Sequence, residues 1–91
     1  MAVEVRIPTI LRPLTANQKA VQGEGDTLEA LLHDLDGKYS GLRGRLVDDE
    51  GALRRFVNVY LNDEDVRFLG GLETKLGDGD TVTILPAVAG G

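Results

Sequence analysis

Apolar and charged residues alternate at the start of the chain, where Val3, Val5 and Ile7 are separated by Glu4 and Arg6. An alternation with a period of two predicts a β-strand with one buried face. Residues 19–22 are predicted to form a second strand that closes a hairpin on the first. The prolines at both ends of residues 8–13 predict a loop between the two strands.

The clearest helical signal is a stripe of leucines spaced three and four residues apart. This spacing places their side chains on one face of an α-helix. Asp26, followed three residues later by Glu29, resembles a capping box at the helix start, and Gly37 is placed to end the helix. Further along, Leu42 and Leu46 predict a short second helical segment or a loop that covers the core. The stripe consists of Leu28, Leu31, Leu32 and Leu35.

The second half of the chain predicts three more strands. Residues 56–61 (FVNVYL) have strong strand propensity, and their side chains alternate between two faces. After a tight turn, residues 66–68 predict a short strand. The last strand covers residues 81–85 and ends before Pro86, because proline donates no hydrogen bond to a sheet.

The predicted order is strand, strand, helix, strand, short strand, strand. One helix with one apolar stripe covers one face of one sheet, which predicts an α+β domain with two layers. The order is that of the β-grasp (ubiquitin-like) fold, with a mixed sheet of about five strands and one main helix on one face. Residues 1–86 are assigned to this domain and residues 87–91 to a flexible C-terminal tail.

Composition and charge exclude several classes of function. The chain of 91 residues has no cysteine, so disulfides, thiolate metal sites and thiol-bound sulfur are excluded. The net charge of −5 disfavours nucleic acid as a partner and favours a basic protein surface, although acidity also serves solubility. No apolar run is long enough to span a membrane, and the N-terminus does not resemble a signal peptide. We therefore expect a cytoplasmic protein without membrane contact.

The residues after the last predicted strand are all small or apolar. Two terminal glycines alone indicate only a frayed end. Glycine lacks Cβ, however, so its backbone can pass through a narrow channel of a partner. An ATP-dependent enzyme can convert the terminal carboxylate to an acyl-adenylate, and a sulfur donor that displaces AMP leaves a thiocarboxylate. The segment that would thread into such a partner consists of Ala87, Val88, Ala89, Gly90 and Gly91.

Three stretches carry a resemblance to a known family: residues 7–13 (IPTILRP), 57–68 (VNVYLNDEDVRF) and 78–91 (DGDTVTILPAVAGG). Together they resemble the ThiS/MoaD family of ubiquitin-like sulfur carriers. The combination of Asp-Gly-Asp turn, strand, proline and terminal Gly-Gly is typical of the whole family. The first two stretches are more similar to the CysO-type carriers of cysteine biosynthesis than to other members.

The resemblance implies a carrier protein that is not an enzyme. An E1-like adenylyltransferase would activate Gly91, and a sulfurtransferase would convert it to the thiocarboxylate. A cysteine synthase dependent on pyridoxal phosphate would accept the sulfur, and a metalloprotease would release the new cysteine. ATP and pyridoxal phosphate would belong to these partners, so the carrier, expected to be a monomer on its own, would bind no cofactor and no metal.

The tail leaves other functions open. A ubiquitin-like modifier that forms isopeptide bonds with lysines also uses an adenylated Gly-Gly end, and in a plain interaction module the glycines would be incidental. The sulfur acceptor is equally open: thiamin thiazole, molybdopterin, thiolated tRNA and a secondary metabolite are alternatives to cysteine.

A docking patch for partners is predicted at Phe56, Tyr60 and Leu85. If Val57 and Val59 face the helix, then Phe56 and Tyr60 lie on the open side of the sheet. Leu85 joins them because it is out of phase with the core positions of the last strand. An exposed apolar cluster beside the tail indicates a docking surface, unless loops or the N-terminal segment cover it.

The remaining polar candidates are predicted to be structural. His33 lies off the leucine stripe and is expected to be a solvated surface residue. The pairs Asp63 with Asp65 and Asp78 with Asp80 lack the twelve-residue loop of a calcium site, so turn chemistry explains them better.

Overall fold

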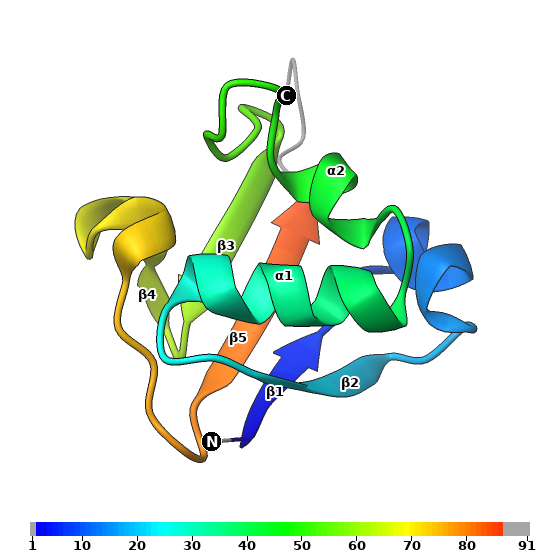
Figure 1. Ribbon diagram of the computed structural model, residues 1–91, viewed down its shortest axis with the longest axis horizontal. Coiled ribbons are helices and arrows are strands. Elements are labelled where there is room, and N and C mark those ends of the chain that lie inside the picture. The colour runs from blue at the N-terminus through cyan, green and yellow to red at the C-terminus, as the bar shows by residue number, and fades with distance from the viewer. Residues whose placement is uncertain (1, 87–91) are drawn as a thin grey trace.

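The computed structural model describes residues 2–86, which form a five-stranded sheet with α1 across one face (Figure 1). The strand order is β2-β1-β5-β3-β4. The neighbours β1 and β5 run parallel, whereas the other neighbouring pairs are antiparallel, so the sheet is mixed. The strands are β1 (Ala2–Arg6), β2 (Ala20–Glu24), β3 (Val57–Leu61), β4 (Glu64–Asp65) and β5 (Thr81–Pro86).

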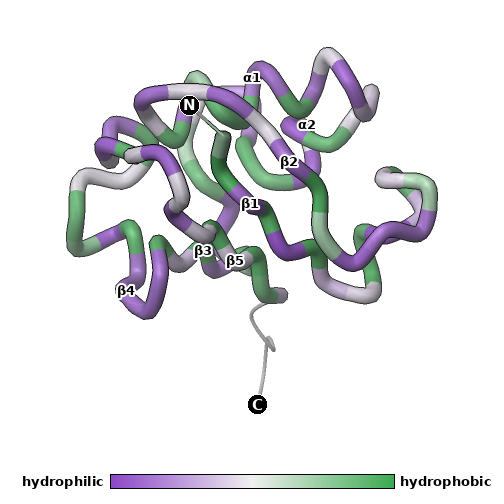
Figure 2. Tube along the Cα trace, turned by 90° about the horizontal axis from the view of Figure 1, so that it is seen from below, coloured by the Kyte–Doolittle hydropathy of each residue, from purple (hydrophilic) through white to green (hydrophobic). Residues whose placement is uncertain are grey.

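The first and last strands pair in the middle of the sheet. Val5 lies opposite Val82, and Val59 lies opposite Ile84; none of these side chains is more than 2% exposed. Figure 2 shows hydrophobic and hydrophilic residues alternating along β1. Because every second residue shares a face, one side of the sheet forms the core and the other meets solvent.

The leucine stripe forms the helix and packs on the sheet, as predicted. Helix α1 (Leu28–Lys38) buries all four leucines to 1% exposure or less. Burial of each such side chain is worth about 2 kcal/mol, so these residues dominate the core. The short helix α2 (Leu42–Leu46) adds two more buried leucines at its ends. The prediction of a two-layer β-grasp domain is confirmed.

The start of α1 differs from the predicted capping box. The N-cap is Thr27, whose hydroxyl accepts a hydrogen bond from the backbone N–H of Ala30 at 3.2 Å. The prediction that Asp26 caps the helix is therefore wrong by one residue. Glu29 does not close a box either, because its carboxylate binds the guanidinium of Arg43 at 2.5 Å and so ties α2 to α1.

The end of α1 also differs from the prediction. Gly37 lies inside the helix, which continues to Lys38. The Lys38 ammonium lies 3.1 Å from the carboxylate of Asp34, one turn earlier, and such a pair supports a helix. The backbone N–H of Tyr39 then donates to the carbonyl of Leu35, so the last turn closes beyond the glycine.

Two segments adopt 3-10 helices where other structure is predicted. Residues Thr9–Thr15 form η1 in place of a loop, and this turn buries Leu11 while Ile10 stays 65% exposed. Residues Val66–Phe68 form η2, so the predicted strand at 66–68 is wrong. The reason is local: the Asp65 side chain accepts the backbone N–H of Arg67 at 2.9 Å, which starts a helical turn.

The strand ends are otherwise close to the prediction. β4 precedes η2 and comprises only two residues at the edge of the sheet. A further 3-10 turn, η3 (Gly71–Glu73), follows. Pro86 is the last residue of β5 rather than the first residue after it, and it lies opposite Val57 in the register of β3.

Candidate docking site at the end of the sheet

The open face of the sheet, the side opposite α1, carries the predicted residue Leu85. Its pairing partner on β3 is Asn58, whereas the core residue Ile84 pairs with Val59. Leu85 is 44% exposed, but Val82 and Ile84 are buried. The end of β5 therefore presents an apolar side chain to solvent directly before the last described residue, Pro86.

Phe56 lies beside Leu85 but does not belong to the strand. It occupies the turn before β3 and is 60% exposed. Together with Leu85, Pro86 and Ile10 of η1, it lines a hollow of about 150 Å³, which we refer to as the docking hollow. Ile10 was not predicted as a site residue, yet it is one of the most exposed large apolar side chains of the described chain. Three exposed apolar side chains thus surround the point where β5 ends.

Tyr60 lies further along the open face. It pairs with Thr83 of β5 and with Asp65 of β4, and it is half-buried. It does not line the hollow that Phe56 and Leu85 share. The structure therefore brings two of the three predicted docking residues together and places the third toward the sheet edge.

Arg67 fixes the turn that carries Phe56. Its guanidinium donates to the Asn58 side chain at 3.1 Å, to the Arg54 carbonyl at 2.9 Å and to the Val57 carbonyl at 2.7 Å. These bonds connect η2 to the chain on both sides of Phe56. The sequence gives no signal for this role, because Arg67 and its acceptors are distant along the chain.

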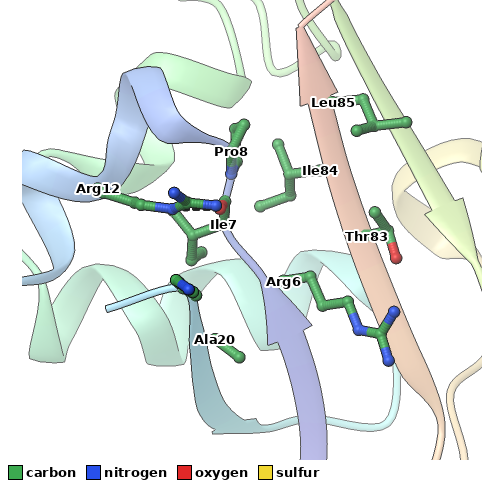
Figure 3. Close-up of a pocket in the computed structure, with 9 residues that line it drawn as sticks. Arg6, Ile7, Pro8, Arg12, Ala20, Thr83, Ile84 and Leu85 are labelled. Atoms are coloured by element: carbon green, nitrogen blue, oxygen red, sulfur yellow. Dashed lines mark hydrogen bonds between the residues drawn. The ribbon is translucent and has the colours of Figure 1, made fainter. Parts of the chain in front are cut away.

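A second hollow, of about 330 Å³, lies on the other side of Leu85, between η1 and β5 (Figure 3). We refer to it as the basic groove. Arg6 extends over β5 toward Thr83, and Arg12 lies across Ile7. The Arg12 Nε donates to the Ile7 carbonyl at 3.1 Å. The lining of the groove is Arg6, Ile7, Pro8, Arg12, Lys19, Ala20, Thr83, Ile84 and Leu85.

Two carboxylates have lowered pKa values because they accept hydrogen bonds from backbone N–H groups, and neither belongs to the docking site. The pKa of Asp34 is lowered first by the hydrogen bond from the Glu24 N–H, at 2.9 Å, and then by Lys38. The pKa of Asp48 is lowered first by the hydrogen bond from the Ala52 N–H, at 3.0 Å. Both side chains therefore stabilise local structure.

The other polar candidates are also engaged in local structure. His33 lies with its side chain 63% exposed and its Nε2 2.9 Å from a Glu29 oxygen. Asp78 accepts the Ala2 N–H at 2.9 Å, and Asp80 accepts the Gly77 N–H at 2.8 Å, which is turn chemistry.

Two kinds of feature are absent from the part of the chain that the structure describes. Among residues 2–86, no group of three or more His, Cys, Asp or Glu side chains is arranged to hold a metal ion. No helix in that part of the chain has the length and apolar character needed to cross a membrane.

Comparison with known proteins gives this geometry a context. Residues 5–91 match the ThiS family. The chain belongs to the ThiS family. This assignment spans the sheet, the docking hollow and the predicted tail, which lies outside the described residues.

The ThiS-family chain is similar along its whole length to sulfur carriers. It is 62% identical to the sulfur carrier protein CysO of Mycobacterium tuberculosis, covering 100% of both chains. The crystal structure of M. tuberculosis CysO superposes with a TM-score of 0.91 at 61% identity, covering 94% of this chain and 99% of that one. These matches support a sulfur carrier of the CysO type.

Two further relatives of the ThiS-family chain bear on its partners. A crystal structure of the Amycolatopsis orientalis BexX/CysO complex matches with a TM-score of 0.91 at 55% identity, covering 98% of this chain and 99% of that one. The small archaeal modifier protein 3 of Haloferax volcanii is 38% identical, covering 100% of both chains. The relatives named here are carriers and a modifier.

Proposed function

We propose that this chain carries sulfur as a thiocarboxylate on Gly91 and donates it in cysteine biosynthesis. The observation that carries the proposal is the full-length similarity to CysO at 62% identity, within a family match that extends to residue 91. The lack of cysteine adds support, since it leaves the terminal carboxylate as the place to hold sulfur.

The chemistry proceeds in two displacements. A carboxylate oxygen of Gly91 attacks the α-phosphorus of ATP, which forms an acyl-adenylate and releases pyrophosphate. A sulfur nucleophile at the oxidation level of sulfide then attacks the acyl carbon, and AMP leaves with the electron pair of the broken C–O bond. The carrier supplies the reacting group and its recognition, and the partner enzyme supplies the electrostatic stabilisation of the transition state.

The docking hollow gives the activating enzyme a place to bind. Ile10, Phe56 and Leu85 expose apolar surface at the end of β5, and burial of such surface is what drives most protein association. Tyr60 extends the contact along the open face. An enzyme that covers the hollow would receive residues 87–91 directly beside its contact surface, with Ala87, Val88, Ala89 and Gly90 entering its channel.

The partners follow from the proposed chemistry. An E1-like adenylyltransferase activates Gly91, a sulfurtransferase supplies the sulfur, a cysteine synthase dependent on pyridoxal phosphate accepts it, and a metalloprotease releases the product. The complex of a relative with BexX supports docking of this fold on a partner protein. Because the activation consumes ATP, we place the chain in the cytoplasm.

A second candidate function is that of a protein modifier. The similarity to a small archaeal modifier protein, at 38% identity, favours it specifically. In that case the acyl-adenylate would pass Gly91 to the amino group of a lysine on a target protein, and an isopeptide bond would replace the thiocarboxylate.

Intact-mass measurement separates these functions. The full chain is incubated with ATP, the E1-like adenylyltransferase of the same genome and a sulfide source. The expected product has one oxygen replaced by sulfur, and deletion of Gly91 abolishes it, whereas Ala87→Ser, which keeps both glycines, retains it. Conjugates of higher mass that resist thiol reagents would favour the modifier. A product that still forms without Gly91 would overturn both.

A further inference from the structure

The basic groove combines three cations with no carboxylate among its lining residues. This composition is unexpected in a chain with fifteen acidic and ten basic residues. Arg6 is partly neutralised, because its Nε lies 3.1 Å from a Glu4 oxygen. Within residues 2–86, neither Arg12 nor Lys19 has a carboxylate within ion-pair distance. The groove therefore concentrates positive charge that the fold itself leaves uncompensated.

The backbone of Ile7 binds the Arg12 guanidinium directly and fixes the main chain at Lys19. Its carbonyl accepts the Arg12 Nε at 3.1 Å, and its N–H donates to the Lys19 carbonyl at 2.8 Å. One buried residue thus positions the Arg12 side chain (Figure 3) and the main chain of Lys19, whose side chain is exposed. Groups that are held before binding lose less conformational entropy when a partner arrives, so the arrangement favours recognition of an anion.

Leu85 connects the groove to the docking hollow. The same side chain lines both depressions, together with Pro8 and Ile84. A partner segment that crosses Leu85 therefore meets the hollow, apolar except for Arg45, on one side and the cations of the groove on the other. The continuity links the charge to the end of β5, where the proposed chemistry takes place.

We propose that the basic groove docks an acidic segment of the adenylyltransferase. Two carboxylates of that segment pair with Arg12 and Lys19, while an apolar side chain between them packs on Leu85. This inference rests on the proposed function, because it names the surface chemistry of the enzyme that takes the tail. The proposed partner segment is acidic, whereas the net charge of the whole chain favours a basic partner surface.

The local charge decides the sign of the interaction. Ion pairs formed at a contact surface are governed by the groups within about 10 Å, since salt screens more distant charges. The lining of the groove supplies Arg6, Arg12 and Lys19, and the acidic groups beside it, Glu4 and Asp63, lie on the Arg6 side. Complementary charge at the rim of an interface mainly raises the association rate, and that rate falls with ionic strength.

The test measures binding of the full chain to the adenylyltransferase without ATP, by titration calorimetry at low and high salt. Lys19→Glu reverses a charge on the groove. Because the Lys19 side chain is exposed, the variant should fold normally. Lys75→Glu makes the same charge change at another exposed lysine, which pairs with Thr27 before α1, away from β5's end. Arg12→Gln removes the second cation without reversing it.

The expected result is a Kd raised about fivefold to tenfold by Lys19→Glu and about threefold by Arg12→Gln, with a weaker salt dependence in both. Lys75→Glu should change the Kd less than about twofold. Equal changes of the Kd in Lys19→Glu and Lys75→Glu would overturn the inference. It would also be overturned if sedimentation showed that Lys19→Glu changes only the self-association of the carrier and not its binding to the enzyme. Intact-mass analysis is a separate readout: binding without sulfur loading would refute the proposed function and leave the groove assignment standing.

Discussion

Truncation of the docking hollow gives a sharp test of how partners find the tail. Phe56 and Leu85 are 60% and 44% exposed. Complete burial of a Phe or Leu side chain is worth about 2 to 2.5 kcal/mol, so covering the exposed fractions gains about 1.5 kcal/mol for Phe56 and about 0.9 kcal/mol for Leu85. The double variant Phe56→Ala/Leu85→Ala should therefore lose about 2.4 kcal/mol of binding, which is roughly fiftyfold in Kd.

The assay is titration calorimetry of the adenylyltransferase with each variant, alongside denaturant unfolding of the free carrier. By the same reckoning, the part of each side chain that is already buried in the free carrier contributes about 1 kcal/mol to folding, so the free energy of unfolding of the double variant should fall by about 2 kcal/mol, which the unfolding curve measures separately from binding. Phe68 offers a matched control, because it is 87% exposed and lies on η2, outside the lining of the hollow. If Phe68→Ala weakened binding as much as Phe56→Ala, the assignment of the hollow would be refuted.

Two further predictions concern stability. Gly37→Ala should raise the free energy of unfolding by about 0.5 kcal/mol, because Gly37 lies within α1 and a Cβ there meets no atom within 4 Å; a decrease in denaturant unfolding would contradict this. The pKa of Asp34 is lower in the folded chain than its usual 3.8, so its contribution is present above that pH and is lost as the pH falls through the folded value. Asp34→Asn should flatten the loss of stability between about pH 5 and about pH 2, and an unchanged profile would exclude the role.

Most of the fold could be predicted because its signals are periodic. The leucines of α1 and the alternation around Val5 and Val59 each define a face, and a single helix face needs a single sheet. These patterns depend on many residues at once, so a single misread position does not change them.

The errors lie where one hydrogen bond decides the structure. Thr27 and Asp26 are both suitable caps, and only the bond to Ala30 distinguishes them. The Asp65 side chain similarly converts the segment after it into a 3-10 turn. A short polar side chain gives the same sequence signal in either role, so the pattern alone cannot assign it.

The site was only partly predictable because it joins distant segments. Leu85 was found from its phase along a strand, a local property. Ile10 became part of the hollow only through the packing of η1 against the end of β5, and Arg67 through bonds to residues ten or more positions away. The sequence shows Ile10 and Leu11 side by side between two prolines, and nothing in it distinguishes the exposed one from the buried one.

The pairing of β1 with β5 also has a consequence for quality control during synthesis. Val5 and Val82 meet in the middle of the sheet, so the ribosome must deliver nearly the whole domain before the central ladder can close. The hollow at Leu85 depends on that ladder and on the neighbouring β3. An enzyme that recognises the hollow would thus bypass nascent, truncated or misfolded chains and commit ATP only to finished carriers.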